Sequence, residues 1–213
     1  MARLIVAAIL ISALVGCGQS ANPTAATSPS AAPSASAALA SGAAAPGEMD
    51  LCARDNGCPL VAGAYAPTKF KPPLRFVVGT GWWNDLHVAD CITLFRDDSQ
   101  KLFFMSGVTA LGRTPDDLLL FARNEELTVS SQTAVRVAGR DGVSIDITTA
   151  MPKTLFPIAG MGMGLDPRQR ARLIGVPSPL GEGLFAILVR SSGPDFDQFM
   201  PEAQKVIDTL QFR

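Results

Sequence analysis

Residues 133–151 read TAVRVAGRDGVSIDITTAM, and this stretch predicts how the chain is built. Its two halves are rich in β-branched residues and meet at Asp141-Gly142, a dipeptide that favours a tight hairpin turn. In the second half, one side of the chain is polar and the other is apolar or β-branched, the latter comprising Val143, Ile145, Ile147 and Thr149. The stretch therefore predicts two antiparallel strands, of which the second has one buried face.

Other segments of the chain predict further strands. PPLRFVVG (72–79) follows a proline pair, and GLFAILVR (183–190) is apolar on both faces, which is typical of a central strand. VADCITLFR (88–96) and KLFFMSGVTAL (101–111) lie on either side of the turn-rich sequence DDSQ. This spacing predicts a second hairpin.

Two segments predict helices that cover the sheet. RTPDDLLLFARNEE (113–126) has a helix-start pattern: Thr114 as the cap, Pro115 at the first helical position, and Asp116 and Asp117 in the first turn. GPDFDQFMPEAQKVIDTLQF (193–212) has a helical apolar stripe, with Pro201 expected to kink the helix or to start its second part. The stripe consists of Phe196, Phe199, Ala203, Val206, Ile207 and Leu210. Strands followed by covering helices predict an α+β fold, an antiparallel β-sheet flanked by helices.

The N-terminus has the pattern of an export signal. Arg3 precedes the apolar run LIVAAILISALV (4–15), which is shorter than the roughly 20 residues of a membrane-spanning helix. The tetrapeptide Leu14-Val15-Gly16-Cys17 resembles the lipobox of bacterial lipoproteins. The resemblance implies a signal peptide over 1–16, cleavage before Cys17, and acyl chains (palmitate among them) on that cysteine, so that the protein is lipid-anchored on the extracytoplasmic face of the cell membrane. The alternative is a plain secretory signal with an incidental cysteine.

A linker is expected between the anchor and the folded part. Residues 18–47 contain no charged and no aromatic side chain and consist almost entirely of Ala, Ser, Pro, Thr and Gly. Such a composition cannot bury enough apolar surface to offset the entropy of ordering. We expect 17–47 to be the lipidated cysteine with a disordered tether, which as a random coil spans roughly 30 Å. Residues 48–213 are then a single folded domain.

Export to an oxidising compartment makes a disulfide the expected fate of two cysteines. Cys52 and Cys58 enclose ARDNG, whose Asn-Gly is a strong turn signal that brings the two thiols together. A bridge there would stabilise the fold by about 2 kcal/mol. The alternative, metal binding, needs more ligands than this segment supplies. Cys91 is left over and is expected to be a small buried apolar residue.

Three stretches resemble the PsbP-like domains found in lipoproteins of actinobacteria and related bacteria. They are AGAYAPTKFKPPLRFVVGTGWWN (62–84), VRVAGRDGVSID (135–146) and DFDQFMPEAQKVIDTLQF (195–212), and the likeness covers about residues 61–213. The chain departs from that family in its doubled Trp82-Trp83 and in a longer Gly/Met segment near Met161. The resemblance implies an α/β/α sandwich used as a binding or assembly module, and it implies no catalytic residues.

Signs of catalysis and nucleic-acid binding are weak. The net charge is −1, so no basic surface for nucleic acid is expected. VVGTGWWND (77–85) lacks the third glycine of a dinucleotide loop and places two indoles where a pyrophosphate would approach. A catalytic triad would have to be built on the single histidine, His87, with Asp85 or Asp90 beside it. We expect no enzyme activity and no cofactor, and we keep a hydrolase built around His87 as a third hypothesis.

A metal site at His87 and Cys91 is not expected. The residues around them favour an extended chain, in which positions four apart are separated by about 13 Å. A zinc site would instead need both side chains on one helical face. The chain has one histidine, so a copper site with two histidines is also excluded.

Seven residues are candidates for a contact surface. TLFPIAGMGMGLDP (154–167) predicts a mobile apolar loop carrying Met161 and Met163, and the alternative is an insertion folded over the sheet edge. Arg168, Arg170 and Arg172 share one face if RQRARLIGV is extended, and the alternative is a solvated strand face. Adjacent side chains of a strand point to opposite sides. One of Trp82 and Trp83 is therefore expected in the core and the other at the surface.

The sequence thus predicts a non-catalytic, membrane-anchored module. The first hypothesis is a module for protein interaction or envelope assembly, with an unidentified envelope protein as its partner. The second is a carrier or sensor of an apolar small molecule or lipid that uses 154–167 as a lid. A deep apolar pocket under that segment would favour the carrier. A filled core with an exposed tryptophan would favour the protein partner.

Overall fold

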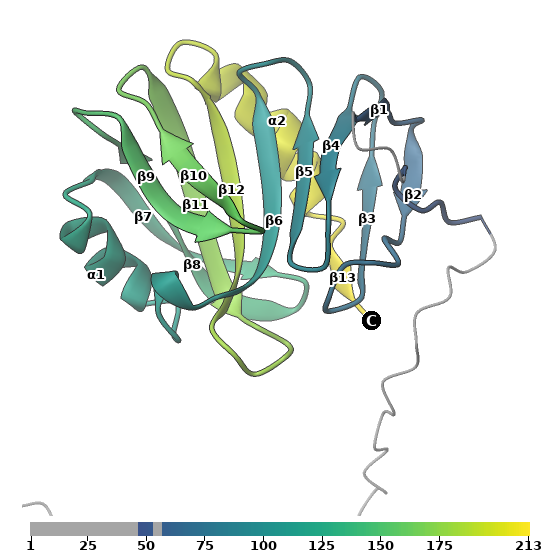
Figure 1. Ribbon diagram of the computed structural model, residues 1–213, viewed down its shortest axis with the longest axis horizontal. Coiled ribbons are helices and arrows are strands. Elements are labelled where there is room, and N and C mark those ends of the chain that lie inside the picture. The colour runs from purple at the N-terminus through teal and green to yellow at the C-terminus, as the bar shows by residue number, and fades with distance from the viewer. Residues whose placement is uncertain (1–46, 53–56) are drawn as a thin grey trace, which may run out of the picture. The chain divides into compact units, whose positions relative to one another are not determined.

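The computed structural model describes residues 47–52 and 57–213 (Figure 1). The expected signal peptide, Cys17 and all but the last residue of the expected tether lie outside the described residues. Within the described part of the chain, no helix is long and apolar enough to cross a membrane.

The described chain is mostly antiparallel sheet with two α-helices (Figure 1). The largest sheet has eight strands, in the order β1 (Cys58–Pro59), β4 (Trp83–His87), β5 (Cys91–Phe95), β6 (Lys101–Val108), β12 (Leu184–Ser192), β11 (Gln169–Pro177), β8 (Arg140–Thr148) and β7 (Thr128–Val137). A three-stranded sheet contains β13 (Gln211–Phe212), β3 (Leu74–Val78) and β2 (Gly63–Tyr65), and a two-stranded sheet contains β10 (Met161–Leu165) and β9 (Lys153–Ile158). The helices are α1 (Asp117–Asn124) and α2 (Phe196–Ile207), with a short 3₁₀ turn at Thr109–Leu111.

The predicted hairpin at 133–151 exists as β7 and β8, but its turn lies elsewhere. Val137 pairs with Arg140, so the two turn residues are Ala138 and Gly139, which both have positive φ as a type I′ turn requires. The prediction of a turn at Asp141-Gly142 is wrong, because both residues belong to strand β8 and pair with residues of β7. A Cβ on Gly142 would come within 2.3 Å of the Gly175 carbonyl oxygen, so this glycine allows β11 to approach closely.

The predicted central strand and second hairpin are confirmed. β12 lies between β6 and β11 in the large sheet, and its residues from Leu184 to Val189 are buried on both faces. β5 and β6 pair as an antiparallel hairpin across the DDSQ turn. In that turn the Asp97 carboxylate accepts hydrogen bonds from the backbone N–H groups of Ser99 and Gln100.

The two faces of the large sheet are covered differently (Figure 1). On one face, here called the α2 face, the predicted apolar stripe of α2 packs against the sheet in a cluster that includes Trp82, Phe104 and Phe185. On the other, here called the hairpin face, α1 and the β9–β10 hairpin contribute to a second cluster that includes Phe103 and Leu188. The sheet therefore has two separate apolar cores.

Both predicted helices form. The Asp117 carboxylate accepts hydrogen bonds from the backbone N–H groups of Arg113 and Thr114, at 2.8 and 2.9 Å, and these bonds hold its pKa below the usual value. The helix begins at Asp117 with Asp116 as its N-cap residue, so the prediction of Thr114 as the cap and Pro115 as the first helical position is wrong, and both residues lie in the turn before the helix. α2 is continuous from 196 to 207 and contains Pro201, which therefore does not divide it.

Residues 154–167 do not form the predicted loop. β9 and β10 pair as a second type I′ hairpin with Ala159 and Gly160 as its turn residues, both at positive φ. Ile158 and Leu165 from its two strands are buried in the hairpin-face core. The alternative, an insertion folded over the sheet edge, is correct in that the segment folds onto the sheet, but the hairpin packs on a face of the sheet that includes the central strands β6 and β12.

Candidate functional site

Four side chains form a row across the hairpin face at one end of the sheet. Trp83 pairs with Phe95, Phe95 with Lys101, and Lys101 with Arg190, on β4, β5, β6 and β12. Residues directly opposite one another in antiparallel strands point to the same face. The Trp83 indole stacks on Phe95 with ring centroids 6.0 Å apart and remains 41% exposed. The row thus runs from an exposed aromatic pair to two cations.

A pocket of about 330 Å³ lies between this part of the sheet and the β9–β10 hairpin. We call it the hairpin pocket. Its lining comes from four sheet strands and from β10, and consists of Asp85, Leu86, Thr93, Lys101, Phe103, Met161, Gly162, Met163 and Arg190. The lining is mixed, with three charged side chains among apolar ones, so it differs from the deep apolar pocket that a carrier of a purely apolar molecule needs.

Arg190 is the most constrained charge of the hairpin pocket. Its guanidinium lies 5.5 Å from the centroid of the Phe103 ring, and its Nη1 donates a hydrogen bond to the carbonyl oxygen of Gly164 in β10. Its Nε is buried and has no hydrogen-bond partner among the described residues. Burial lowers the pKa of Arg190, and the negative charge of Asp166 opposes this effect only in part. The guanidinium therefore retains unused donor capacity.

Lys101 adds a second positive charge beside Arg190. It is half-buried, and the structure gives it no ion pair within the described residues. The one carboxylate in the pocket lining, Asp85, is exposed and follows the register shift between Asn84 and Leu86. The floor of the pocket thus carries an excess of positive charge.

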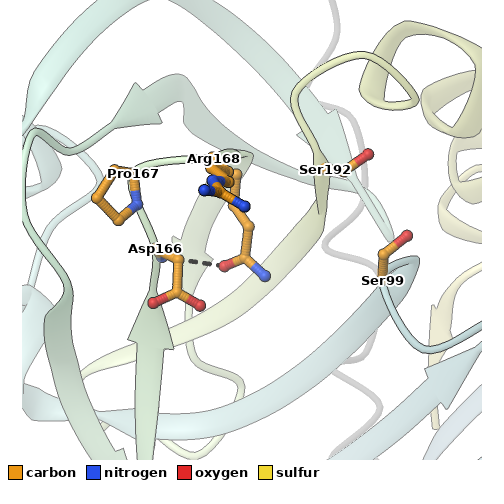
Figure 2. A pocket seen from close by; sticks show the side chains of 6 residues that line it. Ser99, Asp166, Pro167, Arg168 and Ser192 are labelled. Carbon is orange, nitrogen blue, oxygen red and sulfur yellow. Dashed lines mark hydrogen bonds between the residues drawn. The ribbon is translucent and has the colours of Figure 1, made fainter.

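A larger hollow, about 420 Å³, lies beside the turn between β10 and β11 (Figure 2). It is lined by Ser99, Asp166, Pro167, Arg168, Gln169 and Ser192. Its polar groups largely satisfy one another, since the Asp166 backbone N–H donates to Gln169 at 3.0 Å and Ser192 donates to Asp195. We regard the hairpin pocket as the better candidate because it alone of these two contains a buried donor without a partner.

One of the two tryptophans is buried and the other is exposed, as the sequence predicts. Trp82 is 2% exposed and packs 5.8 Å from the ring of Phe199 in α2, whereas Trp83 is exposed at the end of the row described above. The two methionines that are candidates for the contact surface also differ in burial. Met163 is 5% exposed and belongs to the hairpin-face core, and Met161 is 44% exposed at the rim of the hairpin pocket. Met161 and Met163 therefore line the hairpin pocket, whereas Trp83 lies outside its lining, at the far end of the row that leads to Lys101.

The arginine stripe does not form a free basic surface. The Arg172 guanidinium forms two hydrogen bonds to the Asp146 carboxylate, at 2.6 and 2.8 Å. Arg170 forms an ion pair with Asp197 of α2 at 3.0 Å and lies over the Phe196 ring. Only Arg168 is exposed, and it lies at the hollow of Figure 2 rather than at the hairpin pocket. For Arg170 and Arg172 the alternative, a strand face with acidic neighbours, is correct.

His87 and Cys91 are not on one strand, so that part of the prediction is wrong. His87 ends β4 and Cys91 begins β5, and the turn between them is closed by a backbone hydrogen bond from Val88 to Cys91. Burial lowers the pKa of His87, and its other electrostatic neighbours are Asp50, Lys69 and the Cys52 backbone. No three His, Cys, Asp or Glu side chains converge on a possible metal position among residues 47–52 and 57–213.

The three described cysteines follow the sequence prediction. Cys52 and Cys58 form a disulfide, which ties the first described segment to β1. Cys91 is a free and fully buried thiol. Burial raises the pKa of Cys91 to about 12, so the thiol stays protonated and unreactive at neutral pH.

Sequence reasoning missed Lys101 and Arg190. They lie 89 positions apart and become neighbours only because β6 pairs with β12. One local signal existed: Arg190 ends the apolar run GLFAILVR and is the one charged residue of the central strand β12, where a charge is unusual.

Comparison with known proteins bears on the fold alone. No protein-family model and no curated protein matches the chain. The solution structure of cyanobacterial PsbP (CyanoP) from Synechocystis sp. PCC 6803 is similar with a TM-score of 0.44 and 11% identity, over 75% of this chain and 94% of that chain. A crystal structure from Bacteroides thetaiotaomicron VPI-5482 has a TM-score of 0.39 and 12% identity, over 66% of this chain and 45% of that chain. Of the fold that the sequence predicts, the described chain has a mostly antiparallel sheet and two helices.

Proposed function

We propose that this chain is a membrane-anchored extracytoplasmic lipoprotein whose PsbP-like domain acts by binding rather than by catalysis, and that it binds in the hairpin pocket. The observation that carries the proposal is that one cavity is lined by both the exposed side chain of Met161 and the guanidinium of Arg190, whose buried Nε has no hydrogen-bond partner among the described residues. The cavity volume, about 330 Å³, is at the lower end of the range of about 300–1,000 Å³ that is usual for small-molecule sites. The ligand class is a small molecule or lipid with an apolar part.

A protein partner is the second candidate, and the exposure of Trp83 favours it. An indole exposed on one edge and stacked on Phe95 on the other is a common anchor in protein interfaces. In this version the domain is an assembly module, and the tether lets it reach outward from the membrane.

Photo-crosslinking in the native envelope tests both versions. A photoreactive amino acid is placed at Met161, and the matched control has it at Leu180, which is similarly exposed but lies away from the pocket. We expect the Met161 position to give a low-mass adduct detectable by mass spectrometry, and the Leu180 position to give none. A protein-sized adduct at Met161 supports the second candidate. Equal labelling at both positions contradicts a binding site under the hairpin.

The anchor is tested separately. Cys17→Ala removes the acyl-accepting thiol, so we expect the full chain to leave the membrane fraction and to appear in the medium. Retention of the variant in the membrane fraction contradicts the anchor while leaving the binding site unaffected, since Cys17 is not part of it.

A further inference from the structure

The hairpin pocket holds two positive charges that face each other across neighbouring strands. Lys101 and Arg190 are register partners on β6 and β12, and like charges in such positions repel. Neither has an ion pair within the part of the chain that the structure describes. A negative group placed between them would remove this repulsion.

The hydrogen-bond donors of Arg190 also favour a negatively charged group in the pocket. Guanidinium carries five N–H donors in a fixed fork, and it matches the oxygen atoms of carboxylate or phosphate. The Gly164 carbonyl accepts from Nη1, while the buried Nε has no partner among the described residues. The exposed Asp166 acts on Arg190 through its charge but forms no ion pair with it, so the pocket lacks a direct partner that a ligand oxygen would supply.

Asp85 does not supply the partner that Arg190 lacks. It lines the pocket but is exposed, and no hydrogen bond or ion pair joins it to Arg190 or Lys101 in the described residues. Its carboxylate instead lowers the positive potential that an incoming anion meets.

The rest of the lining is apolar. Leu86, Phe103, Met161 and Met163 border the pocket beside the two cations. Met163 is buried and Met161 is exposed at the rim, so an apolar chain that starts at the cations is covered by the hairpin along its length. Unbranched, polarisable methionine side chains adapt readily to such a chain.

We propose that the hairpin pocket binds a small amphiphilic anion, with its carboxylate or phosphate oxygens between Lys101 and Arg190 and its apolar chain against Phe103 and Met163. The inference rests on the proposed binding function and adds the charge of the ligand. The same chemistry occurs in a free fatty-acid-like molecule and in the headgroup of an anionic lipid, and the test below separates these sources.

The test uses the full lipidated chain in nanodiscs of zwitterionic phosphatidylcholine. The methyl groups of Met161 and Met163 are followed by ¹³C NMR, which reports on the pocket and not on partition into lipid. The probes are octanoate, octanol and inorganic phosphate. We expect saturable shifts of both methyl signals with octanoate, binding at least tenfold weaker with octanol, and no saturable shift with phosphate alone.

Variants test the two cations independently. Lys101→Met removes no ion pair of the described residues and is expected to weaken octanoate binding at least fivefold. Arg190→Met is expected to weaken it more than tenfold. Asp85→Asn removes an opposing charge, so octanoate should bind several-fold more tightly. Arg136→Gln, an exposed cation on β7, is the matched control and should change nothing.

The outcomes are distinguishable. Octanoate and octanol binding equally well, or octanoate binding that is unchanged in both Lys101→Met and Arg190→Met, overturns the anion inference but leaves the pocket a binding site. No saturable shift with any probe, together with no adduct at Met161, overturns the proposed function as well. Replacing part of the phosphatidylcholine by phosphatidylglycerol identifies the source: weaker octanoate binding there indicates competition from a lipid headgroup, and unchanged binding indicates a free amphiphile. Both results support the inference.

Discussion

On the α2 face of the large sheet, Arg170 and Arg172 form ion pairs with Asp197 and Asp146, whereas on the hairpin face the register partners Lys101 and Arg190 form no ion pair among the described residues. The same contrast holds for aromatic side chains. Trp82 is enclosed under α2, and Trp83 is exposed at the far end of the row that leads to Lys101. One face of the sheet satisfies its charges and fills its core, which is what stability requires. The other leaves charge and apolar surface available, which is what binding requires.

The tryptophan pair should give the largest difference between the faces. Trp82→Ala leaves a cavity against Phe199, and we expect it to lower the free energy of unfolding by about 3–5 kcal/mol. Trp83→Ala should cost less than about 1 kcal/mol, because its indole is largely at the surface. Urea unfolding followed by circular dichroism measures both. Equal losses in the two variants would show that the hairpin face is as closely packed as the α2 face.

Local patterns predicted the regular elements but not the contacts between them. The apolar stripe of α2 and the apolar run of β12 are short-range features, and both were predicted at nearly the correct residues. The turn at Asp141-Gly142 was wrong because Gly142 is needed for the approach of β11, a contact that local sequence does not contain. Residues 154–167 read as a loop because the segment is rich in glycine, which is depleted in strands. The pairing of its two strands depends on packing against the large sheet, which the local sequence does not contain.

The site was less predictable than the fold for the same reason. Trp83, Met161 and Met163 were found because rare residue types draw attention in a sequence. The partners that distinguish Arg172 from Arg190 come from other strands, Asp146 in one case and Lys101 in the other. Whether an arginine is neutralised is therefore decided by strand pairing.

Variants of one arginine on each face should give the next largest difference in the free energy of unfolding. Arg172→Met leaves the Asp146 carboxylate, whose side chain is 10% exposed, without its cation. Loss of one partner from a buried pair costs about 3–5 kcal/mol, and we expect roughly 1–3 kcal/mol here because the Arg172 side chain is 30% exposed. Arg190→Met removes a charge that has no ion pair among the described residues, together with one hydrogen bond to the Gly164 carbonyl, so its cost should be about 1 kcal/mol or less. A larger loss for Arg190→Met, measured by urea unfolding without ligand, would mean that this guanidinium is structural.

The pH dependence of stability should differ between variants that affect Asp146 and variants that affect an exposed carboxylate. Burial alone raises the pKa of Asp146, but hydrogen bonds and charge from Arg172 outweigh burial and leave the pKa below its usual value. Its stabilisation is therefore complete above the unfolded-state pKa of about 3.9 and is lost as the pH falls through the folded-state pKa. The stability gap between the wild-type protein and Arg172→Met should shrink between pH 5 and pH 2. Asp141→Asn, which removes an exposed ion pair with Arg136, should show no such trend.

The smallest effect should come from the two Ala-Gly turns. Gly139 and Gly160 have φ of 79° and 74°, and neither has an atom within 4 Å of the position that a Cβ would take. Alanine at either position therefore carries only the cost of positive φ, about 1 kcal/mol. The β7–β8 hairpin is part of the large sheet, so Gly139→Ala should lower the free energy of unfolding of the whole domain. In β9–β10 it falls on a two-stranded sheet, so Gly160→Ala should speed hydrogen exchange of residues 153–165 roughly fivefold and leave the other strands unchanged. Exchange that rises equally throughout the domain would show that the hairpin opens only with the whole fold, and that a ligand enters the pocket without local opening of its cover.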